Sequence, residues 1–118
     1  MPARLKPADP AAVAEALDRM AADTAERADL KLLVKHFLAV LEERAPGRSV
    51  EVRVPPYAAV QVIEGVRHTR GTPPAVIETD AATWIALATG ALAWPTAVES
   101  GGVRASGERT DLSSYLPL

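Results

Sequence analysis

Hydrophobic and polar residues follow two different periods along this chain, and the change of period predicts its secondary structure. In two early segments the apolar residues recur every three or four positions, as on one face of an α-helix. The first segment begins at Asp9-Pro10, a pair typical of a helix N-cap and first turn, and extends to about Met20–Thr24. The second and stronger segment runs from about Asp29 to Arg44. We therefore predict a helical pair over about residues 9–45.

Alternation of apolar and polar residues then replaces the helical period. Val50–Val54 reads Val-Glu-Val-Arg-Val, the pattern of a strand with one face toward a core. Tyr57–Ile63 contains fewer polar residues, so we expect this strand to be central or covered on both faces. Two more short strands are expected at Ala75–Thr79 and Val103–Ser106. The polar stretch Glu64–Pro74 is the longest expected loop, and loops often carry binding residues.

A stretch without charge stands out in the last third of the chain. No charged residue occurs between Asp80 and Glu99. Asp80 suits a helix N-cap and Gly90 a helix end, so we expect a helix over about Ala81–Thr89. The apolar residues of this helix lie on more than one side of its surface. Neighbouring elements must therefore bury more than one side of this helix.

Two short helical segments complete the chain, and the order of all elements predicts the fold class. We expect a short helix through Ala97 and Val98 and a C-terminal turn of helix over Asp111–Leu116. Helices and strands in this order predict an α+β fold, with helices packed on one face of a mainly antiparallel sheet. At this length one core is expected. Residues 1–118 should form a single domain, with the sheet and C-terminal helices over about residues 49–118.

Charge and composition narrow the function classes. The chain has 118 residues, of which 48% are hydrophobic and 24% charged, as in ordinary globular domains. The net charge of -2 argues against binding to nucleic acid or to an anionic membrane surface. Cysteine is absent, which excludes disulfides, thiolate metal sites and cysteine nucleophiles.

Membrane insertion and secretion are not expected either. The uncharged stretch contains Gly90 and Pro95 and consists mostly of Ala and Thr, so we predict no stable insertion into a membrane. The first residues form no apolar run of signal-peptide length. We expect a cytoplasmic protein that needs no cofactor.

One loop offers candidate chemistry. His68 lies between Arg67 and Arg70 in the glycine- and proline-bounded loop, where a general base or an anion pocket is one interpretation. The other is a solvated loop whose arginines pair with local carboxylates. The second histidine, His36, lies beside Phe37 in the second helix and is interpreted as structural. No cluster of metal ligands follows from these positions.

Other motifs point to no reaction. The glycines match neither a P-loop nor a dinucleotide-binding fingerprint, and no serine lies in a G-x-S-x-G setting. Trp84, Trp94 and Tyr115 either line an apolar pocket or belong to a plain core. The residues by themselves leave both interpretations open.

Read together, the last forty residues resemble the C-terminal half of the sterol carrier protein type 2 superfamily. The resemblance rests on Thr83-Trp84 and Leu87 with Gly90, on Ala97-Val98 and Gly102-Val103, on Ser106-Gly107-Glu108, and on Asp111-Leu112 to Leu116. Three earlier blocks resemble more narrowly the short bacterial sterol carrier family proteins, which are mostly actinobacterial. These blocks are Val52–Tyr57, His68–Pro74 and Glu78-Thr79-Asp80.

The resemblance implies a sheet of about five strands with helices on one face, enclosing an apolar cavity for a lipid-like ligand. It also places apolar residues of several elements around that cavity. They are Phe37, Leu41, Val60, Val62, Trp84, Leu87, Trp94, Val98, Leu112, Tyr115 and Leu116. Arg67, His68 and Arg70 would form its polar mouth. The expected function is non-catalytic binding or carriage of an apolar or amphipathic small molecule.

Two alternatives remain beside this function. The same fold occurs as an accessory domain of isomerases, so the chain could serve an isomerase-type enzyme acting on a small acidic substrate through the His68/Arg70 loop. Alternatively, a second copy of the chain could bury the uncharged helix in a homodimer. The resemblance does not extend to the ligand preference of eukaryotic members, and the C-terminus carries no peroxisomal address.

Overall fold

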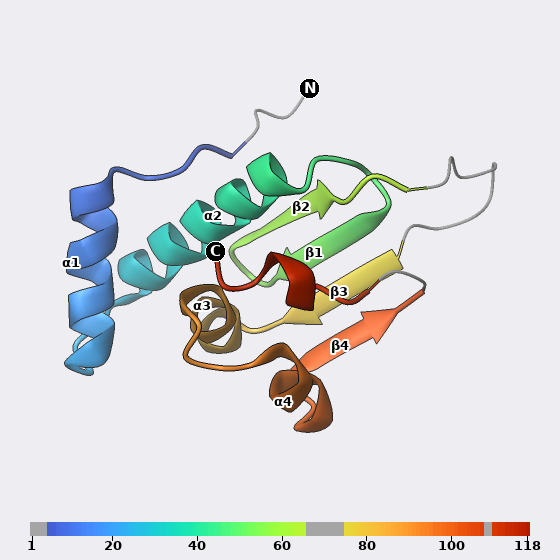
Figure 1. Ribbon diagram of the computed structural model, residues 1–118. Helices are drawn as coiled ribbons and strands as arrows, with labels where there is room; N and C mark the ends of the chain where they lie inside the picture. Colours follow the sequence, from blue (N-terminus) through green and yellow to red (C-terminus); the bar gives the residue numbers. More distant parts are fainter. Residues whose placement is uncertain (1–4, 66–74, 108–109) are drawn as a thin grey trace.

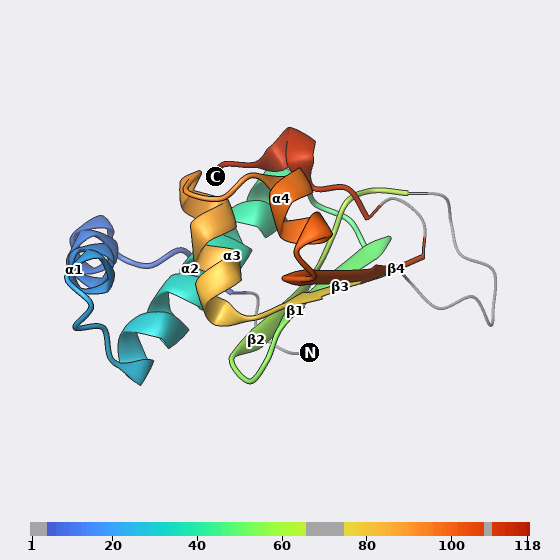
Figure 2. The same cartoon turned by 90° about the horizontal axis from the view of Figure 1, so that it is seen from below.

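A layer of helices covers one face of a four-stranded sheet in the computed structural model, which describes residues 5–65, 75–107 and 110–118 (Figure 1). The fold class is α+β, as predicted. In Figure 2 the sheet is seen nearly edge-on, with α3, α4 and the C-terminal segment on the same side. Helix α1 packs against the outside of α2, away from the sheet.

The predicted helical pair is confirmed. Helix α1 spans Pro10–Ala21, and the side chain of Asp9 accepts a hydrogen bond from the backbone N–H of Ala12 at 3.3 Å. Helix α2 spans Arg27–Arg44 and turns Leu33, Val34, Phe37, Leu38 and Leu41 into the core. Spacings of three and four residues place these side chains on one face, which packs on the sheet and on α3.

A hydrogen-bonded ion pair joins the two helices. Arg19 of α1 donates from Nη2 and Nε to the two carboxylate oxygens of Asp29 in α2, at 2.7 and 2.9 Å. The same carboxylate accepts from the backbone N–H of Glu26 at 2.9 Å, which caps the first turn of α2. The Arg19 guanidinium and this backbone hydrogen bond hold the pKa of Asp29 below its ordinary value.

The sheet differs from the prediction in its pairing. Strands β1 (Val50–Val54), β2 (Ala58–Val62), β3 (Ala75–Thr79) and β4 (Val103–Ser106) lie in the order β2-β1-β3-β4. The β1–β3 pair is parallel and the other two pairs are antiparallel. The described residues thus form a mixed sheet of four strands, where about five were predicted, and the sheet is antiparallel except for the β1–β3 pair.

The path from β2 to β3 explains the parallel pair. Val62 at the end of β2 and Ala75 at the start of β3 are both paired with Val50, the first residue of β1. The chain therefore leaves β2 and enters β3 at the same end of the sheet, on opposite sides of β1. Strand β3 consequently runs antiparallel to β2 and parallel to β1.

Strand β2 was expected to be central, and this expectation was wrong. Within the described residues β2 pairs with β1 alone and forms an edge of the sheet. Its low polarity comes from small residues, because Ala59 is exposed together with Gln61 on the face away from the helices. Alanine fits an exposed edge as well as a core, so a lack of charge did not signify burial here.

The two faces of the sheet differ in chemistry. On the helix-covered face Val50, Val52, Val54, Val62 and Ile77 are buried. On the other face Arg53 lies 3.4 Å from Glu51 and 3.9 Å from Glu78, and Glu78 lies 3.9 Å from Arg104. These charged groups are partly or largely exposed, so this face of the sheet meets solvent and helices cover only the other.

The uncharged helix is present as predicted. Helix α3 spans Ala81–Thr89, with the Asp80 carboxylate accepting from the backbone N–H of Thr83 at 2.7 Å and Gly90 ending it at φ 87°. Helix α4 spans Trp94–Glu99, so Trp94-Pro95 is its first turn. None of the described helices combines the length and apolar character that crossing a membrane requires.

The C-terminal turn is a single 3-10 turn, η1 (Ser113–Tyr115), shorter than the predicted segment. Leu112, and not Asp111 as predicted, is the N-cap residue of this turn, and the Asp111 carboxylate before it accepts from the backbone N–H of Ser113 at 2.8 Å. Beyond the turn, the backbone N–H of Leu118 donates to the carbonyl of Ala88 at 2.8 Å. The last residues are thus fastened across the end of α3 (Figure 1).

Candidate functional site

The predicted cavity residues from different elements meet in one apolar core between the sheet and the helices. Most of them are buried there, and they come from α2, β2, α3, α4 and the segment before η1: Phe37, Leu41, Val60, Val62, Trp84, Leu87, Trp94 and Leu112. Tyr115 and Leu116 pack against this core while half-buried. Val98 differs from the rest, because it is 45% exposed on α4.

The three buried polar or charged residues among those described, Asp29, Ser49 and Thr79, have hydrogen-bond partners that connect different segments of the chain. Asp29 pairs with Arg19, as described above. Ser49 donates from its hydroxyl to the carbonyl of Ile63 at 2.6 Å, and Thr79 donates to the carbonyl of Gly102 at 2.6 Å. Each bond fixes one segment of backbone to another. These side chains are therefore satisfied within the fold.

One buried polar atom has no partner. The indole N–H of Trp84 lies in a side chain with 0% exposure and meets no hydrogen-bond acceptor within the described residues. Trp84 is on α3, and the core around it is built from aliphatic and aromatic side chains. A buried donor without an acceptor costs about 1–3 kcal/mol. The position of this N–H makes it the polar feature of an otherwise apolar site.

Sequence reasoning placed Trp84 among the predicted cavity residues as an apolar side chain and did not consider its indole N–H. The signal was available in part. Tryptophan is the one apolar-core residue type besides tyrosine that brings a hydrogen-bond donor, and the stretch around Trp84 carries no charged side chain to accept from it. What the sequence lacked was the position of every backbone carbonyl, which decides whether the donor finds an acceptor.

The proposed polar mouth cannot be placed beside this core. Arg67, His68 and Arg70 lie outside the described residues. The structure does describe both ends of that loop. The backbone N–H of Ile63 donates to the carbonyl of Ala45 at 2.6 Å, and that of Ala75 donates to the carbonyl of Ser49 at 3.2 Å. The ligand-orienting role of the three residues, and the isomerase alternative built on them, stay predictions.

The second histidine has the structural role that was predicted. His36 of α2 accepts a hydrogen bond at Nδ1 from the backbone N–H of Ala8 at 2.9 Å, and its ring meets that of Phe37 edge to face at 4.9 Å. Partial burial lowers its pKa. No group of three or more potential metal ligands occurs within the part of the chain that the structure describes.

Comparison with known proteins agrees with the geometry. A family model described as "Bacterial SCP ortholog", where SCP denotes sterol carrier protein, matches residues 26–118. No curated protein matches the sequence. The matched range begins just before α2 and includes every strand and the helices α2, α3 and α4. The chain therefore belongs to the bacterial family of sterol carrier protein orthologs.

Proposed function

We propose that this protein binds and carries a lipid-like small molecule, apolar or amphipathic, in the space between the sheet and helices α2, α3 and α4. Membership of the sterol carrier family supports this proposal, and so does the large cluster of buried apolar side chains that includes Trp84 and Leu87. The mechanism is burial without reaction, in which removal of apolar surface from water supplies the affinity.

The observation that carries the proposal is the unpaired indole N–H of Trp84. A ligand oxygen placed against this donor would form a hydrogen bond in a site of low polarity, where the donor otherwise stays desolvated. The ligand that fits best has a long apolar body and at least one hydroxyl, carbonyl or carboxylate oxygen. A pure hydrocarbon would fill the same space and leave the donor unpaired.

Entry of such a ligand requires the cover of the core to move. Two hydrogen bonds hold the last residues of the C-terminal segment over the core: the backbone N–H of Leu118 donates to the carbonyl of Ala88, and Arg44 donates to the carbonyl of Pro117 at 3.5 Å. Tyr115 and Leu116 beside it are half-buried. We propose that the ligand enters beneath this segment and displaces Tyr115 and Leu116 from the core, with Arg67, His68 or Arg70 orienting its polar end.

The first experiment asks whether the protein carries a lipid at all. Purified protein is extracted with organic solvent, and the extract is examined by mass spectrometry for a stoichiometric apolar compound. A protein stripped in this way is then titrated with oleate and with the hydrocarbon heptadecene. We expect oleate to bind more tightly than heptadecene. Absence of any co-purified lipid together with absence of affinity for both probes would refute carriage.

The second experiment tests the donor directly with matched tryptophan variants. Trp84→Phe removes the unpaired N–H, whereas Trp94→Phe removes a tryptophan that retains contact with solvent at 9% exposure. We expect Trp84→Phe to weaken oleate roughly 3–10-fold, the worth of one hydrogen bond, and to leave heptadecene within about twofold. Trp94→Phe leaves Trp84 as the only tryptophan, so its fluorescence reports the binding. Equal losses for both ligands would show that Trp84 acts through shape alone.

A further inference from the structure

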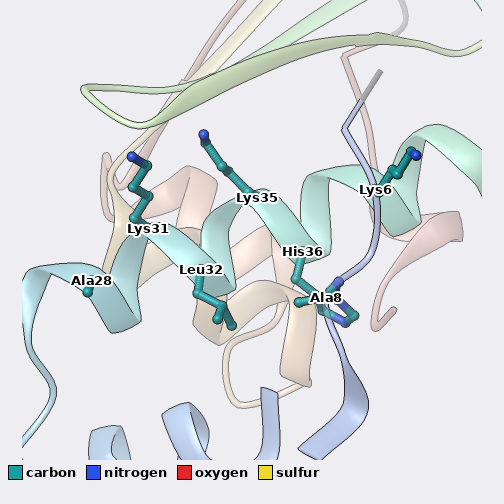
Figure 3. A pocket seen from close by; sticks show the side chains of 7 residues that line it. All are labelled: Lys6, Ala8, Ala28, Lys31, Leu32, Lys35 and His36. Atoms are coloured by element: carbon teal, nitrogen blue, oxygen red, sulfur yellow. Dashed lines mark hydrogen bonds between the residues drawn. The ribbon is translucent and has the colours of Figure 1, made fainter. Parts of the chain in front are cut away.

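All three lysines of this chain line a single groove. The sequence contains ten other basic residues, all arginines, and its lysines occur only at positions 6, 31 and 35. The groove measures about 320 Å³, is open to solvent, and lies along α2 where the N-terminal segment crosses it (Figure 3). Lys6 and Lys31 are 25 positions apart in sequence, so the fold alone brings them to the same place.

The lining of the groove combines apolar residues with basic ones. Ala8, Ala28 and Leu32 supply the apolar surface, and His36 completes the lining. Figure 3 shows Lys31 and Lys35 extending to the same side of α2, while Leu32 and His36 extend to the opposite side and Lys6 lies on the N-terminal segment toward the other end. Among the described residues no acidic side chain lines the groove, and no carboxylate lies within ion-pair distance of these lysines.

The N-terminal segment is held over α2 by a specific hydrogen bond. The backbone N–H of Ala8 donates to His36 Nδ1 at 2.9 Å, so a neutral His36 carries its proton on Nε2. This bond positions both Ala8 and Lys6 at the groove. The family match begins at residue 26, so these two residues come from outside the matched segment. The groove is therefore built jointly by the matched domain and the segment that precedes it.

We propose that this groove is a second binding site, which takes a small amphipathic anion in its free, monomeric form. The alkyl part of the ligand would lie on Leu32, Ala28 and Ala8, and its carboxylate or phosphate group would meet the ammonium groups of Lys31 and Lys35. A groove of about 320 Å³ is at the lower end of the usual range for ligand sites, about 300–1,000 Å³, which favours a medium-length chain. The site is separate from the core that Trp84 occupies.

Titration of the full chain with decyl phosphate, followed by NMR of the backbone amides, tests this site. The three comparison probes are decanol, which lacks charge, inorganic phosphate, which lacks the chain, and vesicles of phosphatidylglycerol. We expect decyl phosphate below its micelle concentration to shift the amides of Ala8 and of residues 28–36, and to bind roughly tenfold more tightly than decanol. Higher salt should reduce that difference, because the groove is open to solvent.

Variants separate this site from the core and from general surface charge. Lys31→Gln with Lys35→Gln should weaken decyl phosphate roughly tenfold, with decanol changed less than twofold. Arg53→Gln with Arg104→Gln is the matched control, since it also removes two positive charges, from side chains that are 50% and 84% exposed on β1 and β4. Trp84→Phe should leave the decyl phosphate shifts in the groove unchanged.

Three outcomes would overturn the proposal. The first is equal loss of decyl phosphate affinity in the double arginine variant and in the double lysine variant, which would show that only the net charge of the protein matters. The second is binding to phosphatidylglycerol vesicles without binding to monomeric decyl phosphate, which would make the groove a membrane contact. The third is a set of amide shifts confined to α3 and β2, which would assign all binding to the core.

Discussion

At the scale of single residues, one glycine decides how α2 is connected to the sheet. Gly47 has φ 151°, and a Cβ there would collide with the carbonyl carbon and oxygen of Ile63. Ile63 itself has φ 67°, an uncommon conformation for a β-branched residue, and its carbonyl accepts from both the backbone N–H and the hydroxyl of Ser49. Because glycine has no Cβ, the backbone at Gly47 can lie close to Ile63 without blocking these hydrogen bonds.

Gly47→Ala should therefore lower the free energy of unfolding by more than about 1–2 kcal/mol, the usual penalty of a positive φ by itself. Gly101→Ala is the control, because Gly101 also has a positive φ of 81° but a Cβ there would meet nothing within 4 Å. Urea denaturation of both variants measures the difference. Equal losses of unfolding free energy in the two variants would mean that the backbone at Ile63 moves away from the new Cβ without destabilising the fold.

His36 makes the stability of the fold depend on pH. Its pKa in the folded chain is lowered from 6.5 by burial, so the unfolded chain binds the proton more readily. The stabilising contribution is complete above about pH 6.5 and is lost as the pH falls toward the lower folded value. Protonation also removes the acceptor that Nδ1 offers to Ala8.

His36→Asn should flatten this part of the pH profile, since asparagine offers an acceptor near the Nδ1 position and does not titrate. Urea denaturation from pH 7.5 to 5 compares the two proteins in a range where Asp29 and Asp111, with pKa values lowered from 3.8, stay ionised. A wild-type profile as flat as that of His36→Asn would contradict the assignment.

At the scale of elements, the periodicity of apolar residues and the residues typical of helix ends predicted the helices and strands well. The pairing of the strands could not be predicted in the same way. The bounds of β1, β3 and β4 agree with the alternating segments, and Asp80 and Gly90 delimit α3 as expected. These signals are local. The parallel pairing of β1 with β3, and the edge position of β2, depend on contacts between distant segments, for which one sequence carries no direct pattern.

The junction of α1 and α2 gives a prediction at this scale. The Asp29 carboxylate accepts from Arg19 and also from the backbone N–H of Glu26 at the start of α2. Of these contacts, the Arg19 side chain takes part only in the ion pair. Asp29→Asn should therefore lower the melting temperature more than Arg19→Gln. The double variant should lose less than the sum of the two, because both single changes break the same pair.

Acid should act on this junction in the same direction. The pKa of Asp29 is lowered in the fold, so its contribution to stability is present above about pH 3.8 and is lost as the pH falls toward the lowered value. A double-mutant cycle measured at pH 7 and again near pH 3 checks this. Strict additivity at pH 7 would show that the two residues stabilise the fold independently.

At the scale of the whole molecule, the two candidate sites were not equally visible in the sequence. The core site followed from apolar periodicity and from the family resemblance, which gathered residues such as Phe37, Trp84 and Leu112. The lysine groove did not, because a net charge of -2 describes the chain as a whole and conceals a local cluster of lysines. Local charge depends on which residues the fold brings together, and Lys6 meets α2 only through the crossing of the N-terminal segment.

The residues that cover α3 lead to a prediction about the oligomeric state. A second copy of the chain was one candidate cover for this uncharged helix. In the structure Trp84, Ile85, Leu87 and Ala88 are buried by the chain itself. Within the described residues Val98 is the only exposed large hydrophobic side chain, and one such residue falls far short of an interface core.

We therefore expect a monomer of 12.5 kDa in light scattering at micromolar concentration, with and without ligand. Val98→Asp provides the matched test, since it places a charge at the exposed apolar position of α4 and leaves the buried face of that helix intact. It should change neither the mass nor the melting temperature appreciably, because exposed substitutions usually alter stability by less than about 0.5 kcal/mol. A dimer that Val98→Asp dissociates would instead identify α4 as a subunit interface, and the core beneath it would then open only in the separated chains.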